Sequence, residues 1–296
     1  MARGRRRRHR SPTRHAVGQA HRLWAMSGNS VLRRARVDGR DAALDAATVG
    51  VLDDGFARGD GAFETVGVWD GAPFRLLDHL QRLAASMDAA SLPAPDLDAL
   101  RADVEAVLDD VSVDAVVRVY ATGSGTRVVT LEAQPEREAP RRLISQPAPW
   151  IRPLGTWALA GVKSMSYLPN MAAGRAAQAA GGDDALLVTL EGFVAEGPTF
   201  AVCWMRDGTL HAPAVELGVV DSISRRSVIE AAQDLGVEVV AGRWGLEAAL
   251  AADEVLVSSA VRPVIALTAI DGHRLPEATP TADQLADVVQ QRRRGR

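Results

Sequence analysis

The chain has 296 residues, 47% of them apolar, which is typical of one large or two ordinary globular domains. No apolar run reaches 18 residues, so the sequence predicts no membrane-spanning helix. A single cysteine, Cys203, excludes an intramolecular disulfide and any metal site built from several cysteines. The six histidines lack the spacing of a metal motif. We therefore expect a cytoplasmic protein without a metal.

Positive charge is concentrated at the start of the chain. The first 37 residues hold eleven arginines and no acid, which leaves 23 basic residues against 37 acids in the remainder. Because blocks of like charge are commonly disordered, we predict a disordered basic tail over residues 1–30. The alternatives are upstream sequence translated from a start before Met26, or an arm that contacts nucleic acid. The acidic remainder of the chain argues against nucleic acid as a partner.

The first half of the chain predicts hairpins mixed with helices. Asp-Gly pairs, which favour tight hairpin turns, occur at residues 38–39 and 70–71. Asp78 and Asp96 are suitable helix starts, and leucines follow Asp78 at helical spacing. The predicted strands cover residues 31–37, 62–69, 72–76, 113–122 and 127–133.

The second half predicts a larger domain over residues 155–296. It is separated from a smaller domain at 31–145 by a proline-containing linker at 146–154. The predicted strands cover residues 157–162, 185–190, 200–205, 237–241, 254–258 and 264–270. The predicted helices cover residues 170–180, 222–235 and 281–291. Many hairpins and few βαβ units indicate the α+β class.

Lys163 is the only lysine among 34 basic residues. Arginine replaces lysine wherever a positive charge is enough, but it cannot replace a primary amine that must lose its proton to form a Schiff base. The count alone is equally consistent with a lysine retained by chance on the surface. The residues around Lys163 have to decide between these two interpretations.

Three features of the second half together favour a pyridoxal-phosphate site. Lys163 supplies an amine, Glu196 a carboxylate for the pyridine nitrogen, and the predicted helix that opens at Ser222 an N-terminus for the phosphate. The glycine-rich stretches at 55–61 and 123–127 match neither a dinucleotide fingerprint nor a phosphate loop.

These residues stand in six segments that resemble the class IV, or fold type IV, pyridoxal-phosphate enzymes. That family includes branched-chain and D-amino acid aminotransferases and 4-amino-4-deoxychorismate lyase. The resemblance extends over residues 35–275 and implies a two-lobed α+β fold with the cofactor between the lobes, and a homodimer whose second subunit completes the active site. The similar segments are 58–65, 78–83, 163–171, 192–197, 221–225 and 253–259.

The resemblance also implies roles for individual residues. Lys163 would be the catalytic lysine, Glu196 the partner of the pyridine nitrogen, and Phe63, Arg127 and Tyr167 would contact substrate. Arg127 is equally consistent with a surface residue, and Tyr167 with a core residue. The residues that would hold the cofactor are Arg82, Lys163, Glu196, Thr199, Ile223, Ser224 and Ser259.

Two chemistries remain open at this point. Phe63-Glu64-Thr65 has the aminotransferase form of the first segment, which favours transfer of an amino group from an amino acid to a 2-oxo acid. The segments after Lys163 and after Glu196 are also similar to aminodeoxychorismate lyases, which release 4-aminobenzoate and pyruvate. A binding protein with an inactive enzyme-like body is a third interpretation, and the intact Lys163–Glu196 pair argues against it.

Overall fold

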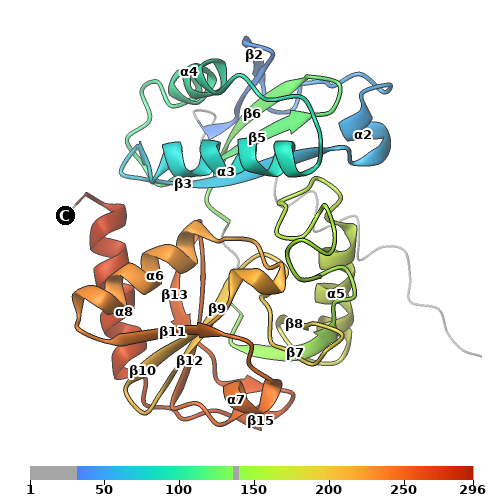
Figure 1. Cartoon of the computed structure of the whole chain (residues 1–296). Coiled ribbons are helices and arrows are strands. Elements are labelled where there is room, and N and C mark those ends of the chain that lie inside the picture. Colours follow the sequence, from blue (N-terminus) through green and yellow to red (C-terminus); the bar gives the residue numbers. More distant parts are fainter. Residues whose placement is uncertain (1–31, 136–139, 296) are drawn as a thin grey trace, which may run out of the picture. The chain divides into compact units, whose positions relative to one another are not determined.

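The computed structural model describes residues 32–135 and 140–295, so the predicted basic tail lies outside the described residues. Leu32–Arg296 form one compact unit. Within it, one sheet is built from the first half of the chain and two sheets from the second half (Figure 1). This mixture of helices and antiparallel sheets confirms the α+β class predicted from the sequence.

The first sheet has six antiparallel strands in the order β2-β1-β6-β5-β3-β4. Helices α3 (Leu76–Ala89) and α4 (Leu97–Val107) pack on one face of it, where their leucines and valines meet the buried side chains of β3 and β5 (Figure 1). The short helix α2 (Asp54–Arg58) precedes β3. The strands are β1 (Arg34–Val37), β2 (Arg40–Ala43), β3 (Gly61–Trp69), β4 (Ala72–Pro73), β5 (Ala115–Thr122) and β6 (Arg127–Ala133).

The second half forms a five-stranded sheet, β11-β10-β9-β12-β13, and a four-stranded sheet, β15-β14-β7-β8. One apolar core joins residues of both sheets, a second lies between the five-stranded sheet and helices α6 and α8, and a third lies between α5 and strands β7 and β8. The strands are β7 (Arg142–Pro147), β8 (Asp184–Val188), β9 (Ala201–Arg206), β10 (Thr209–Pro213), β11 (Glu238–Gly242), β12 (Glu254–Ser259), β13 (Arg262–Ala266), β14 (Ala269–Ile270) and β15 (His273–Arg274). The helices are α5 (Leu168–Ala179), the 3-10 turn η2 (Val215–Leu217), α6 (Ile223–Asp234), α7 (Leu246–Leu250) and α8 (Pro280–Arg293).

Asp-Gly pairs make the tight turns of this fold. In four of the six Asp-Gly pairs of the chain both residues have positive φ, a conformation that the short aspartate side chain and glycine tolerate and that the hairpin turn requires. The hairpins β1–β2 and β3–β4 turn at the two pairs predicted from the sequence. These four pairs occupy residues 38–39, 70–71, 207–208 and 271–272, whereas residues 54–55 lie in α2 and residues 60–61 lead into β3.

The structure departs from the predicted elements around the linker. Residues 142–147 form β7, which pairs with β8 and β14, so the predicted linker at 146–154 begins inside a strand of the second half. Residues 157–162, predicted as a strand, form turns instead. Gly161 has a φ of +73°, which breaks an extended run.

Candidate active site

Lys163 lies beside the start of β3. The Phe63 N–H donates to the Lys163 carbonyl at 3.1 Å, and the Met165 N–H donates to the Gly61 carbonyl at 2.8 Å. The Lys163 N–H donates to the Ser86 hydroxyl of α3 at 3.3 Å. These bonds fix the backbone of the lysine on the six-stranded sheet, although no regular strand leads into it.

Two aromatic rings surround the amine of Lys163. Its Nζ is 4.3 Å from the centroid of the Phe63 ring and 5.2 Å from that of Tyr167. The two rings meet edge to face, and the Tyr167 hydroxyl donates to the Pro198 carbonyl at 2.6 Å. Phe63 and Tyr167, both predicted to contact substrate, are therefore brought to the predicted catalytic lysine.

Burial lowers the pKa of the Lys163 amine to about 8. The carboxylates of Glu64 and Glu196 act in the opposite direction, while the positive charges of Arg82 and Arg118 lower the pKa further. An amine with this pKa gives up its proton near neutral pH far more readily than an ordinary lysine. Lys163 is thus placed in surroundings that suit proton transfer.

Glu196 lies in the segment that follows β8. The Leu187 N–H donates to its carbonyl at 2.8 Å, and the Val220 N–H approaches its Oε1 at 3.5 Å. Burial raises the pKa of its carboxyl to about 7, against the opposing charge of Lys163. A carboxyl with this pKa is short of a partner that would hold it as the anion. Thr199 lies exposed three residues further on.

Arg82 of α3 is held by a buried network. Its Nε and Nη2 donate to the two carboxylate oxygens of Glu64 at 2.7 and 2.6 Å, and its Nη1 donates to the Asp221 carbonyl at 2.8 Å. His79 Nδ1 contacts Glu64 at 2.7 Å. Burial raises the pKa of Glu64, but the bonds from Arg82 and His79 outweigh it and hold that pKa at about 2. Glu64 is therefore an anion that orients Arg82 toward the segment before α6.

The N-terminus of α6 and the end of β12 supply donors for an anion. Ser222 caps α6, so Ile223 and Ser224 occupy its first turn, where backbone N–H groups lack helical partners. The buried Ser259 Oγ at the end of β12 has no hydrogen-bond partner among the described residues. A phosphate group would supply acceptors for all of these donors, so the residues present fit the phosphate of the predicted cofactor.

The structure does not bring Arg127 to Lys163. Its Nε donates to Asp103 of α4 at 2.8 Å, on the helix-covered face of the six-stranded sheet. Arg118 of β5 is two residues before Tyr120, which stacks on Phe63, so Arg118 is on the opposite face, shared with Phe63. A role of Arg127 in binding substrate stays a prediction.

Sequence reasoning missed three contributors to this site. The sequence predicts Glu64 only as part of the first family segment and predicts no role for His79 or Arg118. His79 and Arg82 are three residues apart on α3, a spacing that puts both on one helix face. Alternation along β5 could likewise have placed Arg118 with Tyr120. What no spacing reveals is that Glu64, on β3, faces α3.

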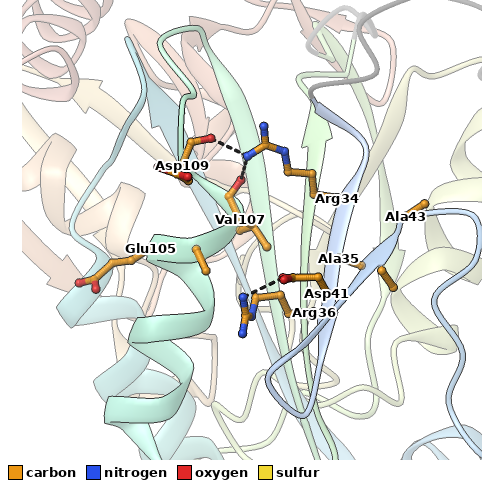
Figure 2. Close-up of a pocket in the computed structure, with 10 residues that line it drawn as sticks. Arg34, Ala35, Arg36, Asp41, Ala43, Glu105, Val107 and Asp109 are labelled. Carbon is orange, nitrogen blue, oxygen red and sulfur yellow. Dashed lines mark hydrogen bonds and ion pairs between the residues drawn. The ribbon is translucent and has the colours of Figure 1, made fainter.

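A separate hollow of about 680 Å³ lies between the β1–β2 hairpin and α4 (Figure 2). Two arginines reach into it, but both are already bonded. Arg34 donates to the carbonyls of Val107 and Asp109 at the end of α4, and Arg36 donates to Asp41. This hollow is therefore explained by the attachment of the hairpin to α4 and offers no free cation for a substrate.

Two further predictions concern absences. Among residues 32–135 and 140–295 no group of three or more His, Cys, Asp or Glu side chains is arranged to hold a metal ion. No helix in that part of the chain has both the length and the apolar character needed to cross a membrane.

Comparison with known proteins agrees with this geometry. The family model described as amino-transferase class IV matches residues 61–270. An aminodeoxychorismate lyase from Bacillus subtilis is 28% identical over 269 residues, covering 82% of this chain and 90% of the lyase. A bifunctional aminodeoxychorismate lyase and D-amino acid transaminase from Mycobacterium tuberculosis is 28% identical over 257 residues, covering 78% of this chain and 89% of that protein.

Solved structures agree as well. A fold IV transaminase from Curtobacterium pusillum has a TM-score of 0.75 at 30% identity, covering 84% of this chain and 93% of that one. A branched-chain amino acid aminotransferase solved with N-(5'-phosphopyridoxyl)-L-glutamate has a TM-score of 0.80 at 26% identity, covering 89% and 94%. The resemblance inferred from the six segments is thereby confirmed, and the chain belongs to the class IV aminotransferase family of pyridoxal-phosphate enzymes.

Proposed function

We propose that this enzyme transfers an amino group from an amino acid to a 2-oxo acid, with Lys163 as its catalytic residue. The observation that supports this best is the position of the Lys163 amine, held between the Phe63 and Tyr167 rings with a pKa of about 8. An amine in such surroundings can bind a carbonyl carbon and afterwards move a proton.

Bound pyridoxal phosphate supplies the aldehyde that takes up the amino group and a ring that accepts electrons from the substrate's α-carbon. Lys163 would hold the cofactor through its Nζ, and the same amine, once free, would be placed to move a proton at the substrate's α-carbon. The Glu196 carboxyl, whose pKa is about 7 without a partner, would partner the ring nitrogen and favour a proton there. Tyr167 and Phe63 orient the reacting groups and exclude water.

The cofactor phosphate would be held by groups from three elements. Arg82 of α3 gives a fixed positive charge, because Glu64 and the Asp221 carbonyl already set its orientation. Ile223 and Ser224 give the first N–H groups and a hydroxyl of α6, and Ser259 gives its unpaired Oγ. Thr199, in the bend after Glu196, would also contact the cofactor, as the family resemblance implies.

Aminodeoxychorismate lyase activity is the second candidate. The Bacillus subtilis relative carries that name, and the Mycobacterium tuberculosis relative carries both names. Glu64 does not separate the two chemistries here, because it is fully buried behind Arg82 and faces no substrate. The presence of Arg118 on the Phe63 face favours transfer between two acids, since one cation can receive the carboxylate of either.

The two candidates are separated by mixing the loaded enzyme with amino acid donors in the absence of an acceptor. An aminotransferase loses the visible absorbance of its bound cofactor with a suitable donor, and 2-oxoglutarate or pyruvate restores that absorbance. If no donor changes the absorbance while aminodeoxychorismate yields 4-aminobenzoate and pyruvate, the enzyme is a lyase. D- and L-amino acids are tested separately to define the stereochemistry.

We further propose that the enzyme is a homodimer. Apolar side chains are exposed close to the segment that carries Lys163: Val51, Leu52 and Phe56 near α2, and Leu168 at the start of α5. Ser166 Oγ donates to the Gly59 carbonyl at 3.1 Å, which joins these two regions. Leu52→Asp should shift the mass measured by light scattering toward the monomer, while Leu77→Asp, an exposed leucine on α3, should leave it unchanged.

We also propose that the enzyme acts in the cytoplasm on small-molecule substrates. Its only cysteine, Cys203, is buried, and burial raises the pKa of its thiol to about 11, so neither disulfide formation nor thiol chemistry is expected of it. Detection of the enzyme in a soluble cell fraction with its cofactor bound would test the location.

A further inference from the structure

Three consecutive arginines at the end of the last helix of the fold, α8, have different surroundings, and the first of them, Arg292, forms ion pairs with Glu230 and Asp234. Arg294 forms ion pairs with Asp70 and Asp114. Arg293 is buried, at 3% exposure, and has no ion pair with any acid among the described residues. A cation buried without a counter-charge is unfavourable unless an anion arrives to balance it.

The guanidinium of Arg293 holds both ends of one tight turn. Its Nη2 donates to the Ser259 carbonyl at 2.6 Å and its Nη1 donates to the Arg262 carbonyl at 2.7 Å. Ser259 and Arg262 face each other across the two-residue turn between β12 and β13. Arg293 therefore fixes the backbone from which the unpaired Ser259 Oγ projects.

The same turn also rests against β3. A side chain at Gly67 would place its Cβ 2.2 Å from the Ala260 carbonyl oxygen, so the turn rests directly on the glycine backbone. The centroid of the Trp69 ring lies 5.0 Å from the Arg293 guanidinium carbon. The face of this ring and the two carbonyl oxygens carry only partial negative charges, so they do not neutralise the cation. Arg293 Nε remains without a partner among the described residues.

We propose that Arg293 is a positioning residue for the cofactor phosphate: it clamps the Ser259–Arg262 turn and supplies a buried positive charge that the phosphate balances. This rests on the proposed phosphate site at Ser259. Burial lowers the pKa of the Arg293 guanidinium to about 10, as expected of a cation that lacks a counter-charge. The C-terminal helix is thereby linked to occupancy of the cofactor site.

The test compares pyridoxal phosphate with pyridoxal, which lacks the phosphate, as ligands of the apoenzyme. Arg293→Met removes the charge and the clamp but keeps the apolar volume. We expect its affinity for pyridoxal phosphate, titrated by visible absorbance, to fall about tenfold or more, with little change for pyridoxal. Arg293→Lys, which keeps the charge but cannot reach both carbonyls as a fork, should lose less. The rise in Tm on adding pyridoxal phosphate should be largest in the wild type, smaller in Arg293→Lys and smallest in Arg293→Met.

Arg294→Met is the matched control, because it removes the arginine that caps the end of α8 and leaves the turn clamped. It should change the Tm of apoenzyme and loaded enzyme equally and leave both affinities intact. The proposal is overturned if Arg293→Met binds pyridoxal phosphate as well as the wild type, or loses both ligands to the same extent. If Arg293→Met does not fold, Arg293→Lys decides by the same criterion. Ser259→Ala tests the phosphate site separately from the role of Arg293. If it leaves the preference for pyridoxal phosphate over pyridoxal unchanged, the phosphate site itself is misplaced.

Discussion

Glu64 and Arg82 meet in a bidentate pair, with Nε–Oε1 at 2.7 Å and Nη2–Oε2 at 2.6 Å. Such a pair fixes the plane of the guanidinium as well as its position. The remaining contact of Arg82 is with the Asp221 carbonyl, one residue before the cap of α6. The first sheet therefore sets the direction of Arg82, the arginine proposed to bind the phosphate, whose third hydrogen bond is to the second half of the chain.

Glu64→Gln should weaken cofactor binding although Glu64 touches no ligand. The amide keeps the shape of the side chain but removes the charge that orients Arg82. Breaking a buried ion pair also destabilises the fold, by about 3 kcal/mol. We expect affinity for pyridoxal phosphate to fall about tenfold, because a charged hydrogen-bond partner is lost. Titration of the apoenzyme by absorbance and denaturant unfolding measure the two effects.

Asp103→Asn provides the comparison. Asp103 is also buried and pairs with Arg36 and Arg127, but it belongs to α4 and forms no ion pair with Arg82. Its variant should lose stability to a similar extent and keep the cofactor affinity of the wild type. Equal losses of affinity in the two variants would show that Glu64 acts only through general stability.

Lys163 should be the point at which the cofactor is attached. Reduction of the loaded enzyme with borohydride should fix the cofactor to the peptide that contains Lys163, because no other side chain in the sequence is a primary amine. Lys163→Arg should bind the cofactor without its characteristic visible absorbance. Mass spectrometry locates the label, and a label on another peptide would contradict the assignment.

The sequence was most informative where a chemical or conformational requirement can be met by only one or a few residue types. Lys163 could be selected because arginine had replaced every other lysine, and the Asp-Gly turns because only a few residues tolerate their backbone angles. The predicted strand at 157–162 was wrong because a short apolar run does not by itself define whether the chain forms a strand, a helix or turns. Its shape is set by neighbours such as Gly218, whose carbonyl accepts from the Gly161 N–H.

Site residues that act by positioning other residues could not be predicted from the sequence. Arg82 was predicted from its helix motif, whereas the Glu64–His79 support depends on the packing of β3 against α3. Arg293 follows Ser259 by 34 positions, and its contact depends on where α8 ends against the sheet. Local patterns predict which side chains a segment presents, but pairing between distant segments is decided by tertiary packing.

Glu196 should make the stability of the apoenzyme depend on pH. Its carboxyl has a pKa of about 7 when folded against an ordinary value of 4.5, so between these values the folded state keeps a proton that the unfolded chain releases. The contribution of this group is present at low pH and is lost as pH rises through 7. The free energy of unfolding should therefore fall less from about pH 5 to about pH 7.5 in Glu196→Gln than in the wild type.

Exposed Glu191, in the turn between β8 and Glu196, gives the control variant Glu191→Gln, which should keep the wild-type pH dependence. Parallel pH profiles for Glu196→Gln and the wild type would remove Glu196 as the titrating group. In the enzyme loaded with cofactor, the wild type should no longer show the extra pH dependence of its free energy of unfolding that Glu196 causes, because the ring nitrogen then partners the carboxyl.

The substrate carboxylate offers the last test, which sets Arg118 against Arg127. Arg118 lies on the sheet face that carries Phe63 and Tyr120, and its charge acts on the pKa of Lys163. Arg127 lies on the other face, bonded to Asp103. Arg118 also pairs with Glu132 at 3.0 Å, so its guanidinium is already held in place before an acid binds.

Arg118→Met should therefore raise the KM for both the amino acid donor and the 2-oxo acid acceptor, by about tenfold each, since both lose the same cation. The visible absorbance of the cofactor should persist, because Arg118 is not among the groups assigned to hold it. Arg127→Met should leave both KM values unchanged while lowering the free energy of unfolding, since it leaves buried Asp103 with one arginine partner fewer. The reverse pattern, with Arg127→Met raising both KM values and Arg118→Met silent, would show that Arg127 holds the carboxylate, which requires it to leave Asp103 or to serve the site of a second subunit.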